Sequence, residues 1–153
     1  AATSTVAWRG VAGNASCALI VGADNMNEVG AAVLARMSVS LDHGVTWTAL
    51  TVPNIGALTF RDVAYCQNSD TFCIVGSFTS ASASTGAALI LMGNPQRENW
   101  MLVDDPKRSS NGSSAGAFGV GSDGRRFCVT YFRFAATDQG NIYFSSPSLG
   151  RRV

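Results

Sequence analysis

Short apolar runs separated by polar turns make up most of the chain. The runs are rich in β-branched and aromatic residues, and none keeps the 3.6-residue spacing of an amphipathic helix over three turns. Clear examples are 17–22, 72–76 and 127–132. The pattern therefore predicts an all-β protein with little helix.

The strand pattern repeats along the chain. The stretch from Trp8 to Ala12 matches the one from Phe60 to Ala64, 52 residues later, and more loosely the stretch 117–121. Ile-Val-Gly at 20–22 recurs at 74–76. Each unit continues with an apolar strand and a turn, at 31–40, 86–93 and 140–146. The unit thus reads as strand, turn, strand, long loop, strand, turn, strand.

A period of a little over 50 residues with four short strands is typical of a β-propeller blade. We expect a single domain over 1–153 with about three four-stranded antiparallel blades, at about 6–53, 58–106 and 115–153, the last incomplete. Propellers have about 4 to 8 blades. The expected ring is therefore partial, or it is completed by oligomerisation.

One hairpin has a specific motif, because residues 40–47 fit S-x-D-x-G-x-T-W at every fixed position. In such a turn the aspartate accepts hydrogen bonds from backbone amides, the glycine supplies positive φ and the tryptophan packs back over the turn. The five matched residues, expected to be structural, are Ser40, Asp42, Gly44, Thr46 and Trp47. The motif resembles the Asp box, the bacterial neuraminidase repeat of sialidases and many other propellers.

The later units depart from the Asp box. Residues 93–100 keep the turn and the terminal Trp100 but lack the aspartate, and the third unit ends before any tryptophan. The wider pattern also resembles tandem repeats of phage tail and virion proteins. That resemblance implies a virion or extracellular location.

The sequence gives no sign of a catalytic site. Sialidases use an arginine triad, a tyrosine nucleophile with a supporting glutamate, and an aspartate; here Arg9 and Arg61 recur at equivalent blade positions, so two guanidinium groups could converge on one face. Glu28 and Glu98 are the only glutamates, and a glycosidase needs two carboxylates about 5–10 Å apart. His43, the only histidine, is expected to be a solvated turn residue. We therefore expect no enzyme activity.

Aromatic and cationic residues are the candidates for contacts with ligands or partners. These are Arg9, Arg61, Trp8 and Trp100. The recurrence of Trp8, Trp47 and Trp100 at strand openings and hairpin ends favours packing. A carbohydrate-binding function would instead need one of them exposed in a groove between blades.

Charge and cysteine content exclude several classes. The net charge is +1 with no basic run, so nucleic acid is not an expected partner, and no apolar run reaches the 18 residues of a membrane span. Four cysteines without a Cys-x-x-Cys pair, beside one histidine, predict no zinc site, and no cofactor motif is found. Cys66 and Cys73 flank a predicted turn, and either a disulfide or two buried thiols fits that spacing.

The incomplete ring predicts assembly, because an unpaired strand edge recruits another chain. Such edges are expected near 1–8 and 139–153, so the expected partners are sister chains or other virion proteins. We expect a non-enzymatic structural or attachment protein, such as a phage tail, fibre or decoration component. The alternative is a lectin-like propeller that binds glycans, or a fragment of a sialidase-like glycosidase.

Overall fold

The computed structural model describes residues 6–24, 34–54, 57–79, 86–103, 115–133 and 139–144. These residues form eleven β-strands and no helix, as expected of an all-β chain. Sheet A contains β1 (Val6–Gly13), β2 (Ala18–Asp24), β3 (Ala35–Ser40) and β4 (Thr48–Ala49). Sheet B contains β5 (Ala57–Cys66), β6 (Thr71–Thr79), β7 (Gly86–Gly93) and β8 (Met101–Leu102). Sheet C contains β9 (Ala115–Ser122), β10 (Phe127–Arg133) and β11 (Gln139–Phe144).

Within each sheet, every strand pairs antiparallel with the strand that follows it in the sequence, so each sheet is a simple meander. β3 begins four residues later than the predicted strand at 31–40, and 31–33 lie outside the described residues. Other parts of the prediction also lie outside the described residues. They are Glu28, the end of the second unit at 104–106, the N-terminal residues 1–5 and the stretch 145–153.

The first strand of each sheet has a β-bulge at the same repeat position. The register of β1 on β2 shifts at Arg9, that of β5 on β6 at Arg61, and that of β9 on β10 at Phe118. A bulge adds one residue to one strand and leaves it unpaired in the ladder. The alignment of the three first strands made from the sequence is therefore confirmed, down to the extra residue.

The recurring Ile-Val-Gly has a steric explanation. Gly22 pairs with Trp8, and Gly76 pairs with Phe60, directly before the bulge. A Cβ on Gly22 would collide with the carbonyl oxygen of Ala7, and a Cβ on Gly76 would collide with that of Thr59. Only glycine lets the bulged strand approach this closely.

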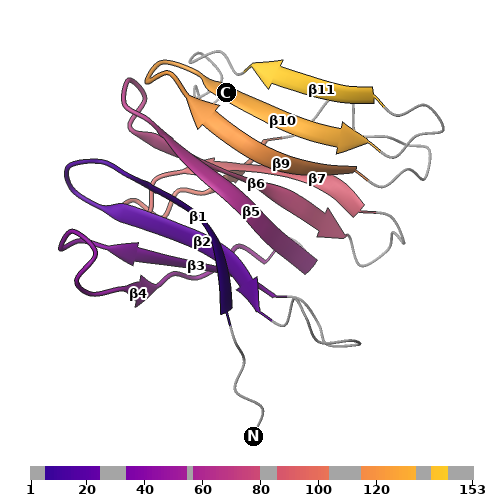
Figure 1. The fold of residues 1–153 in the computed structure, drawn as a ribbon. Coiled ribbons are helices and arrows are strands. Elements are labelled where there is room, and N and C mark those ends of the chain that lie inside the picture. The colour runs from indigo at the N-terminus through magenta and orange to yellow at the C-terminus, as the bar shows by residue number, and fades with distance from the viewer. Residues whose placement is uncertain are drawn as a thin grey trace, which may run out of the picture.

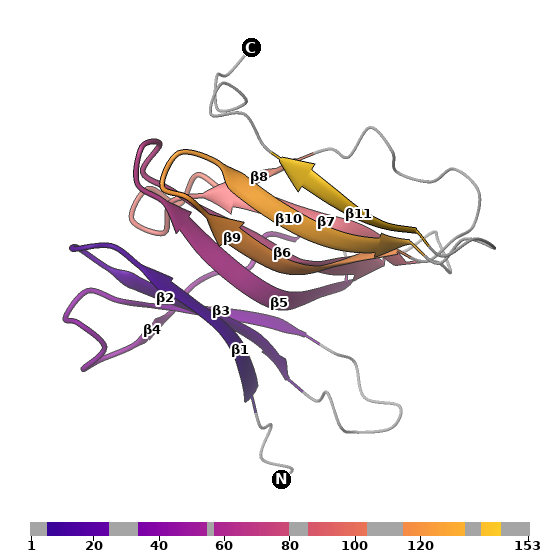
Figure 2. The ribbon, with the colours of Figure 1, turned by 45° about the horizontal axis from the view of Figure 1, so that its top comes forward.

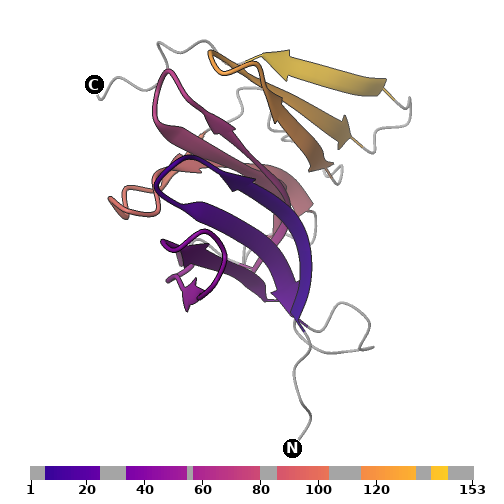
Figure 3. The ribbon, with the colours of Figure 1, turned by 60° about the vertical axis from the view of Figure 1, so that its left-hand side comes forward.

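The three sheets stack face to face in chain order (Figures 1 and 3). Sheet A packs through β1, β2 and β3 against β5, and β9 of sheet C packs against β5, β6 and β7. Figure 2 shows the same order from another side, with sheet B in the middle. We call the side of each sheet that is turned toward the preceding sheet its upstream face, and the opposite side its downstream face.

Sheet B is buried on both faces because side chains alternate along its strands. Phe72 and Ile74 of β6 join the first core, between sheets A and B, with Leu19, Val21 and Met37 of sheet A. Their neighbours along the strand belong to the second core, between sheets B and C. That second core consists of Ala64, Cys66, Cys73, Val75, Ile90, Ala117, Phe127 and Val129.

Candidate functional site

The upstream face of sheet A has no sheet against it among the described residues. Trp8 and Val11 lie on this face, where they pair with Gly22 and Ile20, and they are 46% and 67% exposed. The equivalent residues of sheet B are Phe60 and Val63, which are 0% and 4% exposed under sheet A. The upstream face is thus buried in a core in sheet B and exposed in sheet A.

The expectation that recurring tryptophans pack is wrong for Trp8. Its repeat partner Phe60 is covered only because sheet A precedes sheet B, whereas no described sheet precedes Trp8. Trp100 does pack: it is partly buried against the first core, and a Cβ on Gly93 would lie 2.7 Å from its ring. Trp47 is 39% exposed and lies over its own turn.

The outer part of the same face is polar. Arg36 of β3 donates two hydrogen bonds from Nε and one from Nη2 to the Asp24 carboxylate, at 2.5–2.8 Å. Asp24 is 1% exposed, and this hydrogen bond raises the pKa of Arg36. In sheet B the position of Arg36 is taken by Leu89, because Arg36 pairs with Gly22 as Leu89 pairs with Gly76. The upstream face of sheet A is therefore apolar at Trp8 and Val11 and charged where Arg36 of β3 binds Asp24 at the end of β2.

The downstream face of sheet C is the second face without a described sheet against it. The register places Gly121, Cys128 and Thr130 there, at the positions of Ala64, Cys73 and Val75 in sheet B. Gly121 and Thr130 are exposed, while their sheet B equivalents are buried. A Cβ added at Gly121 would meet nothing within 4 Å.

The three bulge residues form a row across the sheets. The Arg61 guanidinium lies over the Phe118 ring, 4.2 Å from its centroid. Burial, and then the positive charge of Arg9, lower the pKa of Arg61. Its Nε is buried and has no hydrogen-bond partner among the described residues. Arg9 thus lies near enough for its charge to act on Arg61.

The residue after each bulge ties neighbouring sheets together. Asp62 accepts a hydrogen bond from the Val120 amide of sheet C at 3.0 Å and one from the Val63 amide at 2.9 Å. On the other side, a Cβ on Gly10 of sheet A would lie 2.9 Å from the Asp62 Cα and the Val63 amide nitrogen. Neighbouring sheets therefore approach each other closely at the bulges.

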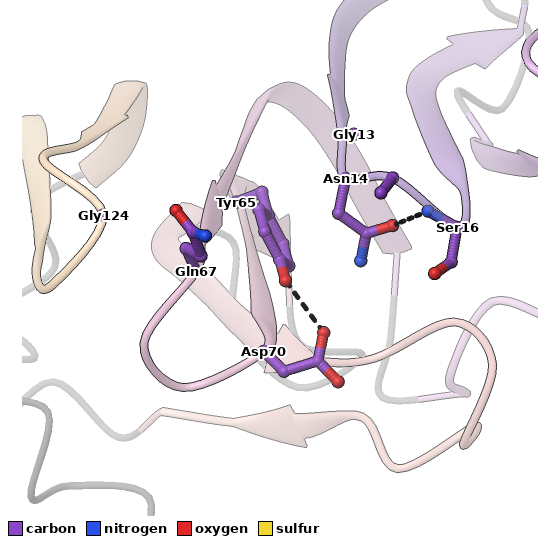
Figure 4. Close-up of a pocket in the computed structure, with 8 residues that line it drawn as sticks. Gly13, Asn14, Ser16, Tyr65, Gln67, Asp70 and Gly124 are labelled. Carbon is purple, nitrogen blue, oxygen red and sulfur yellow. Dashed lines mark hydrogen bonds between the residues drawn. The ribbon is translucent and has the colours of Figure 1, made fainter.

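A groove of about 510 Å³ lies at the turns of the three first hairpins (Figure 4). Its lining comes from the β1–β2, β5–β6 and β9–β10 turns, and Tyr65 stands in its centre. The lining residues are Gly13, Asn14, Ala15, Ser16, Tyr65, Gln67, Asp70 and Gly124. The sequence analysis missed this groove, although each of the three turns was predicted.

Most polar groups of the groove already bind one another. The Tyr65 hydroxyl donates to the Asp70 carboxylate at 2.9 Å, and Arg97 donates to the other Asp70 oxygen at 2.6 Å. The Asn14 side chain accepts hydrogen bonds from the amides of Ser16 and Cys17. Burial raises the pKa of Tyr65, so its hydroxyl remains a donor at neutral pH. These bonds rigidify the wall rather than point to a catalytic group.

The hairpin at 40–47 is held by side chain to backbone hydrogen bonds. Asp42 accepts from the Thr46 amide at 2.8 Å and from the Thr46 hydroxyl at 2.5 Å. The Ser40 hydroxyl donates to Asp42 and accepts from the Gly44 amide, both at 2.8 Å. The Trp47 indole donates to the Gly44 carbonyl at 3.1 Å, and Gly44 has φ of 90°.

These hydrogen bonds lower the pKa of Asp42 to about 2, with the Thr46 hydroxyl the largest cause. His43 is exposed and adopts φ of 58° in the same turn. The Asp42 network thus satisfies groups of its own turn and holds the hairpin together.

The second hairpin lacks the aspartate and has a buried asparagine directly after Gly93. Asn94 is 2% exposed and accepts a hydrogen bond from the Gln96 amide at 2.9 Å. Its side-chain nitrogen donates to the Asp70 carbonyl at 3.1 Å. Asn94 therefore joins this hairpin to the turn that lines the groove, a role that the motif comparison did not reveal.

All four cysteines are free. Cys66 and Cys73 are buried between sheets B and C, and each pairs across the strands with another residue, Thr71 and Ala64. Burial raises the pKa of Cys73 to about 12. Of the two alternatives left by the sequence, the structure has buried thiols and not a disulfide.

Two features of the described part of the chain bear on metal binding and on membrane insertion. No three His, Cys, Asp or Glu side chains come together there in a way that would hold a metal ion. The described residues also contain no helix with the length and apolarity to cross a bilayer. Comparison of the sequence with models of known protein families and with curated proteins finds no match.

Proposed function

We propose that this chain is a non-enzymatic structural or attachment protein, built as part of a β-propeller and assembling through faces that its own sheets leave uncovered. The observation that carries the proposal is the contrast between Trp8 and Val11 and their buried equivalents Phe60 and Val63. Because sheet A covers this apolar face in sheet B, we expect a partner to cover the equivalent face of sheet A. The propeller assignment rests on the repeat, the meander topology and the stacking order.

Within the described part of the chain, the acidic groups are bound to the protein itself or exposed, which supports a non-enzymatic role. Of the groups that a glycosidase would need, Glu98 lies on an exposed turn, and Asp42, Asp62 and Asp70 accept hydrogen bonds from the protein itself. No pair of described carboxylates flanks the groove in Figure 4, where Asp70 is the single acidic residue of the lining. A phage tail, fibre or decoration component, at the virion or outside the cell, fits such a chain.

The experiment is a mass measurement of the purified chain over a range of concentrations, together with particle binding. Sedimentation velocity should show species larger than the 16.0 kDa monomer, or the chain should bind a virion particle or another virion protein. A monomer at every concentration, with no binding to sister chains or particles, would contradict the proposal.

The groove supports carbohydrate binding as a second candidate function. A tyrosine ring beside amide and carboxylate groups, here Tyr65, Gln67 and Asp70, is a combination that can contact both the face and the hydroxyls of a sugar. Glycan-array binding that Gln67→Ala and Tyr65→Phe reduce, while Trp8→Ala leaves it unchanged, would assign the function to the groove. An array without a hit would remove this candidate.

A further inference from the structure

The two uncovered faces are of opposite kinds. Among the described residues, no sheet covers the upstream face of sheet A or the downstream face of sheet C. Both interfaces between the described sheets join a downstream face to the upstream face of the next sheet, first A to B and then B to C. The two uncovered faces are thus the two halves of an interface that the described sheets already make twice.

The free face of sheet C can be compared with the matching face of sheet B. In the second core, Ala64, Cys73, Val75 and Ile90 on the downstream face of sheet B pack against Phe127 and Val129 of sheet C. The equivalents of Ala64, Cys73 and Val75 on sheet C are Gly121, Cys128 and Thr130. An added Cβ at Gly121 would meet nothing within 4 Å, so this part of the face has space for a side chain of another sheet.

We propose that the upstream face of sheet A docks on the downstream face of sheet C of a second copy of this chain. The inference rests on the proposed function and names its partner. Such a contact is heterologous, so two copies that exchange both faces close a ring of stacked sheets. Val11 would then contact the second copy as Val63 contacts sheet A and as Val120 contacts the second core.

The charged edge of the face predicts how tightly the copies bind. Leu89 and Leu91 extend the apolar core along β7, whereas Arg36 and Ser38 hold these positions in sheet A. The new interface would thus be apolar around Val11, with a polar rim along β3. An apolar centre with a polar rim is typical of the interfaces of complexes that form and dissociate. Association should therefore depend on protein concentration.

The test places one charge on each face. Val11→Glu and Thr130→Lys should each raise the dissociation constant at least about tenfold in sedimentation velocity, because the charge would be buried without a partner. Val45→Glu is the matched control, since Val45 is 79% exposed on the hairpin at 40–47, away from both faces. It should leave association unchanged. Circular dichroism and urea unfolding of each variant check that the monomer fold is intact.

Mixing the two variants gives the decisive result. A mixed pair has one Glu–Lys contact and one wild-type contact, so the 1:1 mixture should associate to within about threefold of wild type while each variant alone does not. Loss with Val11→Glu but not with Thr130→Lys would overturn the proposal in favour of two sheet A faces meeting. Wild-type association that neither variant weakens would overturn it and leave the proposed function standing. A wild type that is monomeric throughout, yet binds a virion particle, would mean that another protein covers the face.

Discussion

The upstream faces of sheets A and B have the same backbone register and opposite environments. Trp8 and Phe60 both precede a bulge and pair with a glycine, yet one is 46% exposed and the other fully buried. Local sequence determines the register, because the bulge and the glycine lie within one hairpin. Burial of the upstream face depends instead on the sheet in front of it. In the described residues, sheet A lies in front of sheet B, and no sheet lies in front of sheet A.

The largest expected difference comes from truncating the two aromatic residues. Phe60→Ala removes a fully buried ring between sheets A and B and should destabilise the monomer by about 3–5 kcal/mol. Trp8→Ala should destabilise it by less than about 1 kcal/mol, because the indole is half exposed. Urea unfolding at a low protein concentration measures both. Equal effects would contradict the stacking order.

The glycines before the bulges should behave alike in both sheets. A Cβ at Gly22 or Gly76 meets a backbone carbonyl of its own sheet, which cannot move aside easily. Alanine at either position should therefore destabilise by about 1–3 kcal/mol, regardless of what covers the face. Gly121→Ala is the control, because it has open space and should change stability by less than about 0.5 kcal/mol. A large effect at Gly76 alone would mean that the sheets do not share this geometry.

The Asp62 carboxylate should contribute to the contact between sheets B and C. Asp62→Ala leaves the Val120 amide without its acceptor and should destabilise by about 1.5 kcal/mol. Asp62→Asn retains an oxygen acceptor and should recover part of the loss. Amide hydrogen exchange at Val120 gives a local readout, and exchange unchanged in Asp62→Ala would exclude the bridge.

The Asp42 network predicts a small pH effect confined to acid. The folded pKa of about 2 lies below the ordinary value of 3.8, so the stabilisation is present above about pH 4 and is lost as the pH falls toward 2. Asp42→Asn should flatten the pH dependence of stability within that window. A carboxyl titration of Asp42 by NMR with a midpoint near 4 would show that the network does not form.

The sequence was sufficient for features that depend on one hairpin or on repetition. The three units align at the residues where the structure has its bulges, and Ile-Val-Gly marks the close approach of β1 to β2 and of β5 to β6. The Asp42 hairpin follows from its motif in the same way, because all its hydrogen bonds lie within residues 40–47.

Features that depend on several sheets at once were not predicted. Trp8 is exposed because no described sheet lies in front of sheet A, which the repeat alone does not reveal. The groove combines three turns from Asn14, Gln67 and Gly124, which are far apart in the sequence, and its Asp70 is oriented by Arg97 and Asn94 of another hairpin. The contact of Arg61 with Phe118 also joins two sheets, and each of these residues lies at the bulge of its own sheet.

Thiol labelling tests most directly whether the upstream face of sheet A is built to be covered by a second copy. A Val11→Cys variant should react with a maleimide about ten times more slowly at high protein concentration than at a concentration where the chain is monomeric, because the second copy then covers the face. Val45→Cys, on the exposed hairpin, should react at the same rate at both concentrations. Equal rates for Val11→Cys at the two concentrations would contradict the account.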